Sequence, residues 1–318
     1  MRRLALGVTL LLTACIAPRE RTNPKLVAGE QRLAVPGGHI WYKISNDSAR
    51  GTPLVLLHGG PGMNSFYLKP LEALRGDRPV IRYDQLGGGH SDSLSDTTMM
   101  NIAHFVAELD SLRSALGVER WHVYGHSWGS MLALEYYKAH PDRVASLTLG
   151  GPVFDVPAVT AHVRSLIPTL SDSAQRAIRR TEAAQKWDDP HYQNASNEFM
   201  GKYLVLRPRQ PDWDSTFATF NPAVYQYMQG PSEFTILGTF KDWSAMEWLP
   251  TIKVPVLVTV GEMDEVGVEP ARAGASRIPG ARFEVIPGAA HLAQWDNTDR
   301  TLQLERDFLR NVDTAPVR

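Results

Sequence analysis

At Gly125-His126-Ser127-Trp128-Gly129 the chain carries a pentapeptide of the G-x-S-x-G type. An apolar run, residues 121–124, precedes it, and a helix-like stretch, residues 131–138, follows it. Glycines at both ends allow a strand to turn sharply into a helix, which exposes the hydroxyl of the central serine at the start of that helix. The pattern is short enough to arise by chance, but its two flanks favour Ser127 as a nucleophile.

Two later loops supply candidates for an orienting acid and a general base. Asp264 follows a predicted buried strand, residues 254–260, and His291 follows a second predicted strand, residues 282–286. Because the carboxyl ends of parallel strands meet at one edge of a sheet, both side chains are expected at that edge. Serine, acid and histidine then occur along the chain in the order found in α/β-hydrolases.

Other residues compete for these two roles. Glu262 and Glu265 flank Asp264, which is preferred on position alone. His291 is preferred as the base because its loop follows the last predicted strand and precedes the last predicted helix, residues 301–309. The remaining candidate histidines are interpreted as surface or supporting residues: His58, His90, His104, His122, His126, His140, His162 and His191.

Two backbone N–H groups are candidates for an oxyanion hole. One belongs to Trp128, directly after the serine, and the other lies in His58-Gly59-Gly60-Pro61-Gly62, after an apolar strand at residues 54–57. Glycines at this point let the backbone approach a tetrahedral oxyanion with no Cβ in the way. The alternative is that residues 58–62 form an ordinary turn, but such a turn would not need a His-Gly-Gly-Pro sequence after a buried strand.

Composition indicates one large domain with an insertion. The chain has 318 residues, 43% of them hydrophobic, and a net charge of −1, so it lacks the basic surface that nucleic acids require. No metal-binding or nucleotide-binding motif is present, and no cofactor is expected. Strand-like and helix-like segments alternate over residues 32–151 and 249–318, which predicts an α/β-hydrolase fold with a mostly parallel central sheet flanked by helices.

Residues 152–248 have a different texture and are predicted to form an inserted helical cap over the active site. They lack strong strand patterns and are rich in aromatic residues. Such aromatic side chains are expected to form the core of the cap more often than to line a pocket. They are Tyr203, Trp213, Phe217, Phe220, Tyr225, Tyr227 and Trp243.

The N-terminus predicts export. Residues 1–14 combine a charged start with a short apolar segment, as in a secretory signal peptide, and the segment is too short to span a bilayer. The run Leu12-Thr13-Ala14-Cys15 resembles a bacterial lipobox, and Cys15 is the only cysteine. We therefore expect a mature protein lipid-anchored through Cys15 to a bacterial membrane, with residues 15–31 as a tether. Cleavage near Ala17 and a soluble secreted protein is the alternative.

Several motifs together resemble the proline iminopeptidases of the α/β-hydrolase fold, over residues 35–309. The matching segments are the glycine loop at 58–62, the stretch Tyr83-Asp84-Gln85-Leu86-Gly87-Gly88-Gly89-His90-Ser91, the pentapeptide with Ser130, and Gly261-Glu262-Met263-Asp264-Glu265-Val266. Residues 230–235 and 238–243 resemble the subgroup of the tricorn-interacting aminopeptidase. Gly88 and Gly89 replace residues common in relatives, away from the catalytic parts.

The resemblance implies a role for each site residue. Ser127, Asp264 and His291 would form the triad, and Gly60 and Trp128 the oxyanion hole. Glu233 and Glu265 would bind the free α-ammonium of a short peptide, with Tyr225 helping to orient it. Two fixed carboxylates beside a nucleophile suit this task, because the ammonium is the charge that always lies one residue from the scissile bond.

Three functions follow from these residues. The first is a serine aminopeptidase that releases an N-terminal residue, by resemblance proline. The second is an esterase, lactonase or amidase that uses the same triad on uncharged acyl substrates, with Glu233 and Glu265 incidental. The third is a non-enzymatic surface binding lipoprotein, against which an intact triad argues. The sequence indicates no oligomeric state.

Overall fold

The computed structural model describes residues 26–46, 48–207 and 211–315, whose strands form one eight-stranded sheet. The strands are β1 (Gly29–Val35), β2 (Gly38–Ser45), β3 (Leu54–Leu57), β4 (Val80–Asp84), β5 (Trp121–His126), β6 (Val144–Gly150), β7 (Val256–Gly261) and β8 (Arg282–Ile286). Their order is β1-β2-β4-β3-β5-β6-β7-β8. β2 is antiparallel to β1 and β4, and every other neighbouring pair is parallel. The predicted α/β-hydrolase fold is confirmed.

Ten α-helices and five short 3-10 helices surround the sheet in the described part of the chain. The α-helices are α1 (Ile102–Ala115), α2 (Trp128–Ala139), α3 (Val156–Leu166), α4 (Asp172–Ala184), α5 (Pro190–Tyr203), α6 (Pro211–Ala218), α7 (Pro222–Met228), α8 (Val268–Ala275), α9 (Ala293–Asp296) and α10 (Thr298–Thr314). The 3-10 helices are η1 (Phe66–Gly76), η2 (Thr97–Met99), η3 (Pro141–Arg143), η4 (Ile167–Thr169) and η5 (Leu249–Thr251).

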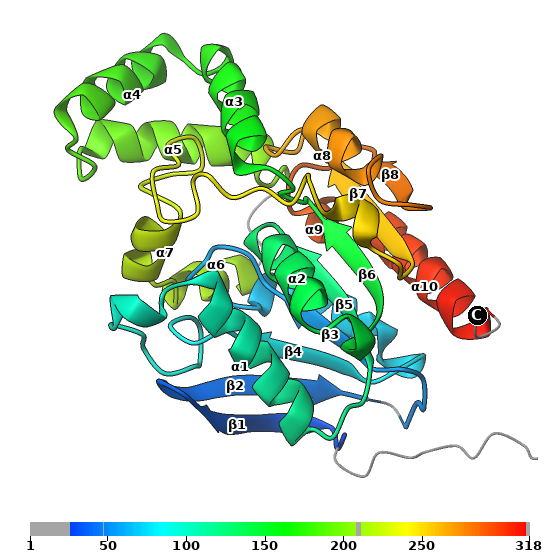
Figure 1. The fold of residues 1–318 in the computed structure, drawn as a ribbon. Coiled ribbons are helices and arrows are strands. Elements are labelled where there is room, and N and C mark those ends of the chain that lie inside the picture. Colours follow the sequence, from blue (N-terminus) through cyan, green and yellow to red (C-terminus); the bar gives the residue numbers. More distant parts are fainter. Residues whose placement is uncertain (1–25, 47, 208–210, 316–318) are drawn as a thin grey trace, which may run out of the picture.

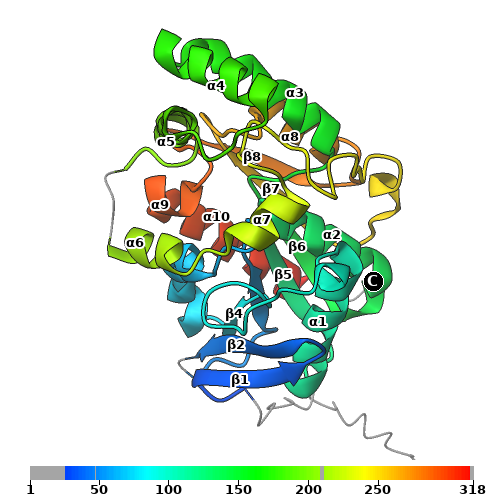
Figure 2. The same ribbon diagram turned by 90° about the vertical axis from the view of Figure 1, so that its left-hand side faces the viewer.

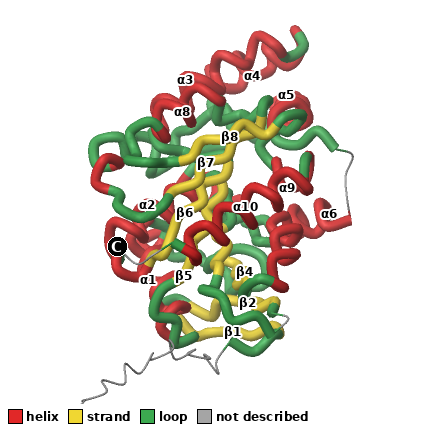
Figure 3. Tube along the Cα trace, turned by 90° about the vertical axis from the view of Figure 1, so that its right-hand side faces the viewer, coloured by secondary structure: helices red, strands yellow, loops and turns green. Residues whose placement is uncertain are grey.

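Both faces of the sheet are covered, and β3 shows why its sequence is apolar throughout. Val55 and Leu57 pack into the hydrophobic cluster that contains the buried residues of α1 and α2. Leu54 and Leu56 point to the opposite face and pack into the cluster that contains α10 and η1. Alternate residues of a strand face opposite sides of a sheet, so a strand between two helical layers has no polar position. Figures 1 and 3 show α1 and α2 on one side of the sheet and α10 on the other.

The cap is inserted in the chain between β6 and β7, which pair directly in the sheet. Helices α3 to α7 all lie in this one connection. Figures 1 and 2 show α3, α4 and α5 grouped beyond one end of the sheet, with α6 and α7 beside its edge. The insertion therefore covers the part of the sheet where the loops after the strands meet.

Some boundaries differ from those that the sequence predicts. β1 begins at Gly29, which pairs with Ile44 of β2, so residues 29–31 belong to the sheet and not to the tether. The first residues of β1 are exposed, so they carry no apolar pattern by which a strand could be recognised. β7 begins at Val256, two residues later than predicted.

The proposed signal peptide and Cys15 lie outside the described residues. Among the described helices, none has both the length and the apolar character needed to cross a bilayer.

Candidate active site

Ser127 occupies a strained turn between β5 and α2. Its backbone has φ 56° and ψ −126°, a conformation that L-residues rarely adopt. The flanking glycines are required by packing: a Cβ on Gly125 would lie 2.3 Å from the carbonyl oxygen of Gly129, and a Cβ on Gly129 would lie 2.2 Å from that of Leu57. The pentapeptide therefore forms a nucleophile elbow, a sharp turn from strand to helix that presents Ser127 at the N-terminus of the helix.

Ser127 opens onto a cavity of about 350 Å³ between the core and the cap. Gly59, Gly60 and His291 line it from the core, and helices α5, α6 and α7 line it from the cap. The cap contributes mainly apolar side chains, which include Met200, Leu204, Trp213, Phe217, Phe220 and Tyr225. Four of the aromatic residues expected in the cap core thus line the cavity, because the short helices α6 and α7 lie along its wall.

A second, smaller cavity of about 30 Å³ lies on another side of Ser127. Its wall is mainly apolar, with Glu233, Glu265 and Gln229 as its polar residues besides Ser127. Both glutamates also line the larger cavity. The two carboxylates therefore stand where the two cavities meet, next to the predicted nucleophile.

The structure brings His291 and Asp264 together in the loops after β8 and β7. The Nδ1 of His291 lies 2.7 Å from Oδ1 of Asp264, and both side chains are buried. The N–H of Val266 donates to the same carboxylate, at 3.0 Å. Glu262, the competing acid, is exposed and accepts from the N–H of Gly288. Asp264 is therefore the carboxylate that orients His291.

Burial and neighbouring charges shift the pKa values of Asp264 and His291 in opposite directions. Burial alone would raise the pKa of Asp264, but the charge and hydrogen bond of His291 outweigh it and hold that pKa below its ordinary value. Burial alone would lower the pKa of His291. The negative charges of Asp264, Glu265 and Glu233 reverse this and raise the pKa to about 9.

The candidate oxyanion donors lie on either side of Ser127. Trp128 is the first residue of α2, where backbone N–H groups have no carbonyl partner within the helix. Gly60 lines the larger cavity with φ +111°, a conformation that favours glycine. The N–H of Gly59 is already bound to the hydroxyl of Tyr67. Gly60 lines the larger cavity and Trp128 the smaller one, and Ser127 lines both, so the two predicted oxyanion-hole residues lie in the walls around Ser127.

Glu233 and Glu265 come from different parts of the fold. Glu233 lies after α7 and accepts hydrogen bonds from the hydroxyl of Tyr225, at 2.7 Å, and from Nε2 of Gln229, at 3.1 Å. Glu265 follows Asp264 and is 4% exposed. Burial raises the pKa of both carboxyls, and the charge of Glu233 adds to the effect on Glu265. Tyr225 contacts Glu233 and thereby fixes the position of its carboxylate.

Apart from His291, whose Nε2 lies 3.7 Å from Oε1 of Glu265, no basic side chain accompanies these acids in the part of the chain that the structure describes. Neither cavity is lined by a lysine or an arginine among the described residues. Buried carboxylates ordinarily pair with a cation. Beside Ser127, one histidine thus faces three buried acids, Asp264, Glu265 and Glu233. Within residues 26–46, 48–207 and 211–315 no cluster of three metal-ligating side chains could hold a metal ion.

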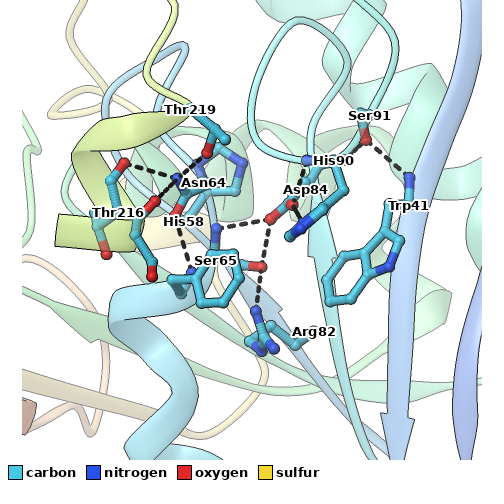
Figure 4. A network of polar contacts seen from close by, with 12 residues as sticks. Trp41, His58, Asn64, Ser65, Arg82, Asp84, His90, Ser91, Thr216 and Thr219 are labelled. Carbon is cyan, nitrogen blue, oxygen red and sulfur yellow. Dashed lines mark hydrogen bonds and ion pairs between the residues drawn. The ribbon is translucent and has the colours of Figure 1, made fainter. Parts of the chain in front are cut away.

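A network of polar contacts involves Asn64 and Ser65, just after the glycine loop at residues 58–62. It was not predicted from the sequence. Asp84, at the end of β4, accepts from the N–H of Ser65 at 2.8 Å and from the N–H of His90 at 2.9 Å (Figure 4). The side-chain amide of Asn64 donates to the carbonyl of Thr216 in α6, at 2.7 Å. The segment around Asp84 carried the family resemblance, and it also contacts the cap: the N–H of Gly89 donates to the carbonyl of Thr219, at 3.2 Å.

A second set of contacts that the sequence did not predict joins His126, beside the nucleophile, to the loop that contains His291. The Nε2 of His126 lies 2.9 Å from the carbonyl oxygen of His291, and its Nδ1 lies 3.1 Å from the hydroxyl of Tyr67. Burial lowers the pKa of His126 to about 3, so its ring is neutral. A carbonyl can only accept, so Nε2 carries the proton and Tyr67 donates to Nδ1. His126 therefore supports the site and does not serve as its base.

Comparisons with known proteins agree with this geometry. A family model described as "alpha/beta hydrolase fold" matches residues 52–298. The chain is 35% identical to the proline iminopeptidase of Heyndrickxia coagulans, over 88% of this chain and 98% of that protein. It is also 35% identical to the proline iminopeptidase of Saccharolobus solfataricus, over 87% and 90%.

A solved structure extends the similarity to three dimensions. The crystal structure of proline iminopeptidase from Mycobacterium smegmatis superimposes with a TM-score of 0.82 at 31% identity, over 90% of this chain and 99% of that one. The chain belongs to the α/β-hydrolase family and, within it, to the proline iminopeptidases.

Proposed function

We propose that this protein is a serine aminopeptidase that releases an N-terminal residue, proline above all, from short peptides. The observation that carries the proposal is the pair of buried carboxylates, Glu233 and Glu265, where the two cavities meet beside Ser127. A substrate with a free α-ammonium supplies a cation for this pair, beside which the described part of the chain places only His291. An esterase acting on uncharged acyl groups has no use for two buried acids at this place.

The proposed reaction passes through an acyl-enzyme. His291 takes the proton of the Ser127 hydroxyl, and the oxygen attacks the carbonyl of the N-terminal residue. The N–H groups of Gly60 and Trp128 stabilise the oxyanion of the tetrahedral intermediate. His291 then donates its proton to the departing amine, and a water molecule, activated by the same imidazole, releases the amino acid. Asp264 stabilises the imidazolium in both steps.

The unequal cavities give the substrate a direction. The smaller cavity has a mainly apolar wall that suits a small apolar N-terminal side chain such as the proline ring. The 350 Å³ cavity is large enough for the departing peptide. With the ammonium between Glu233 and Glu265, the scissile carbonyl lies over Ser127 and the two parts of the substrate enter different cavities.

A matched pair of amides tests this function. We expect the enzyme to hydrolyse a proline arylamide with a free amine and to reject its N-acetyl form, which has the same scissile bond but no charge. Glu233→Gln deletes a charge at constant size, so kcat/KM for the free amide should fall at least about thirtyfold, equivalent to about 2 kcal/mol of transition-state binding. Initial rates over a range of substrate concentrations measure both effects.

An acetate ester serves as the internal reference for the same variant. The ester has no ammonium, and Glu233 is one of the charges that raise the pKa of His291, so ester hydrolysis should not fall. The ratio of amide to ester hydrolysis should therefore fall at least as far as kcat/KM for the amide. Equal cleavage of the blocked and free amides, or a parallel loss of amide and ester activity in Glu233→Gln, would replace the aminopeptidase with a general esterase, lactonase or amidase.

We further propose that the enzyme is exported and lipid-anchored at Cys15, which lies outside the described residues. The lipobox-like sequence supports this location. Stable anchoring needs more than one acyl chain, and in the proposed lipoprotein these chains are attached through Cys15. Cys15→Ser should therefore move the protein from the membrane fraction to the soluble fraction or leave it unprocessed. Cell fractionation with immunoblotting measures the change. Membrane partitioning equal to that of the wild type would favour soluble secretion or another mode of attachment.

A further inference from the structure

The Nε2 atom of His291, which must accept the proton of the nucleophile, is not engaged with Ser127. Among the described residues, this nitrogen is buried and has no hydrogen-bond partner, and the Oγ of Ser127 makes no hydrogen bond either. The nearest acid is Glu265, whose Oε1 lies 3.7 Å from Nε2, within ion-pair distance. The other oxygen of Glu265, Oε2, is also buried without a partner. Without substrate, His291 is thus paired with Glu265 and not with Ser127.

Acidic groups face His291 from three directions. Asp264 contacts Nδ1, Glu265 faces Nε2, and Glu233 approaches from the cap. The ring of His126, whose centroid lies 4.5 Å away, is neutral and adds no charge. On the far side of Asp264 lies His162 of α3, whose pKa burial lowers.

These surroundings favour one extra proton in the free site. The acids raise the pKa of His291 to about 9, and burial together with the charge of Glu233 raises the pKa of Glu265. At neutral pH Nε2 of His291 therefore carries a proton and faces the carboxyl of Glu265 at ion-pair distance. With that proton in place, Nε2 has no lone pair available to deprotonate Ser127.

We propose that the α-ammonium of the substrate activates the catalytic base by taking Glu265 away from His291. As the ammonium binds between Glu233 and Glu265, it replaces the positive charge of His291, whose Nε2 proton is released to solvent. One positive charge enters the acid cluster and one leaves it. His291 becomes a neutral imidazole only when a substrate with a free amine is in place, and it can then accept the proton of Ser127.

This inference rests on the proposed aminopeptidase function and adds a mechanism to it. Recognition of the amine would act on the chemical step as well as on binding. A ligand that fits both cavities but lacks the charge would leave the base blocked. The enzyme would then discriminate through kcat, in addition to the discrimination through KM that an ion pair alone provides.

The pH dependence of ester hydrolysis tests the proposal, because p-nitrophenyl acetate carries no ammonium. For the wild type, kcat/KM should rise with pH through an apparent pKa near 9, since only neutral His291 is active. Glu265→Gln removes a charge within the distance at which a neighbour shifts a pKa by about 1 to 3 pH units. Its apparent pKa should fall by at least about 1 unit, and its ester hydrolysis at pH 7 should rise about tenfold. Hydrolysis of the free proline arylamide should fall in the same variant.

Two controls make the result specific. Glu262→Gln removes an exposed charge of the same loop and should keep the wild-type ester profile. Rates measured with Ser127→Ala give the background to subtract at high pH. If Glu265→Gln keeps an apparent pKa near 9, or loses ester hydrolysis along with amide hydrolysis, the proposal is wrong. The proposed function stands in that case, provided that the wild type still separates the free from the acetylated amide.

A calorimetric experiment tests the same step without a change to Glu265. Prolinamide binds to Ser127→Ala without being hydrolysed, and binding enthalpies in buffers of different ionisation enthalpy give the number of protons released. At pH 7 we expect up to one proton released with prolinamide and none with N-acetylprolinamide. Binding of prolinamide with no proton release, or with proton uptake, would overturn the proposal.

Discussion

Ser127→Ala should lower kcat for a proline arylamide by roughly four to six orders of magnitude, because the members of a catalytic triad act as a unit. The variant retains the cavities and both glutamates, so it should still bind a free-amine substrate. Within the described residues the Oγ of Ser127 makes no hydrogen bond, so its removal leaves no buried partner unsatisfied. The melting temperature should therefore stay close to that of the wild type.

Covalent labelling separates loss of the nucleophile from loss of the fold. A fluorophosphonate should add one adduct to the wild type, located by peptide mass spectrometry at Ser127, and none to Ser127→Ala. His291→Ala should be about as inactive, since it removes the base. A well-folded Ser127→Ala enzyme with substantial amidase activity would contradict the acyl-enzyme mechanism.

The arrangement of the site followed largely from strand order. Each predicted triad residue lies within a few residues of the end of a parallel strand, and parallel strands bring their carboxyl ends to one edge whatever their connections contain. This is why Asp264 and His291, whose loops follow β7 and β8, could be placed together before the fold was known. Their catalytic roles, and that of Ser127, stay predictions until the variants are measured.

The choice among neighbouring acids required the three-dimensional structure. Glu262, Asp264 and Glu265 share one loop, and local sequence does not decide which way each points. The turn is closed by hydrogen bonds: the N–H of Asp264 donates to the carbonyl of Gly261, and its carboxylate accepts from Val266. These contacts turn Asp264 towards Nδ1 of His291 and leave Glu262 in solvent.

The supporting contacts could not be predicted, because they join residues far apart in the sequence. The bond from Asn64 to Thr216 spans 152 residues, and the bond from His126 to His291 spans 165. No local pattern marks either pair. The aromatic residues of the cap were misjudged for a related reason: their composition suits a core equally well, and only the placement of α6 and α7 puts Trp213, Phe217 and Phe220 on the cavity wall.

Asp264→Asn should lower kcat by about four orders of magnitude with little change in substrate binding. Asparagine keeps the size of the side chain and can still accept from the N–H of Val266. It removes the charge that favours a proton on Nδ1, and its amide can present a donor to that nitrogen. His291 would then adopt the tautomer with the proton on Nε2, where it cannot accept one from Ser127.

The pH profile of the residual activity checks this cause. Asp264 is the strongest of the charges that raise the pKa of His291, so the apparent pKa in ester hydrolysis should fall below about 9 in Asp264→Asn, as in Glu265→Gln. The two variants should nevertheless differ in rate at pH 7. Removal of Glu265 frees a correctly oriented imidazole, whereas removal of the Asp264 charge leaves an imidazole in the wrong tautomer. If Glu262→Gln were the inactive variant instead, the carboxylate that orients His291 would have been misassigned.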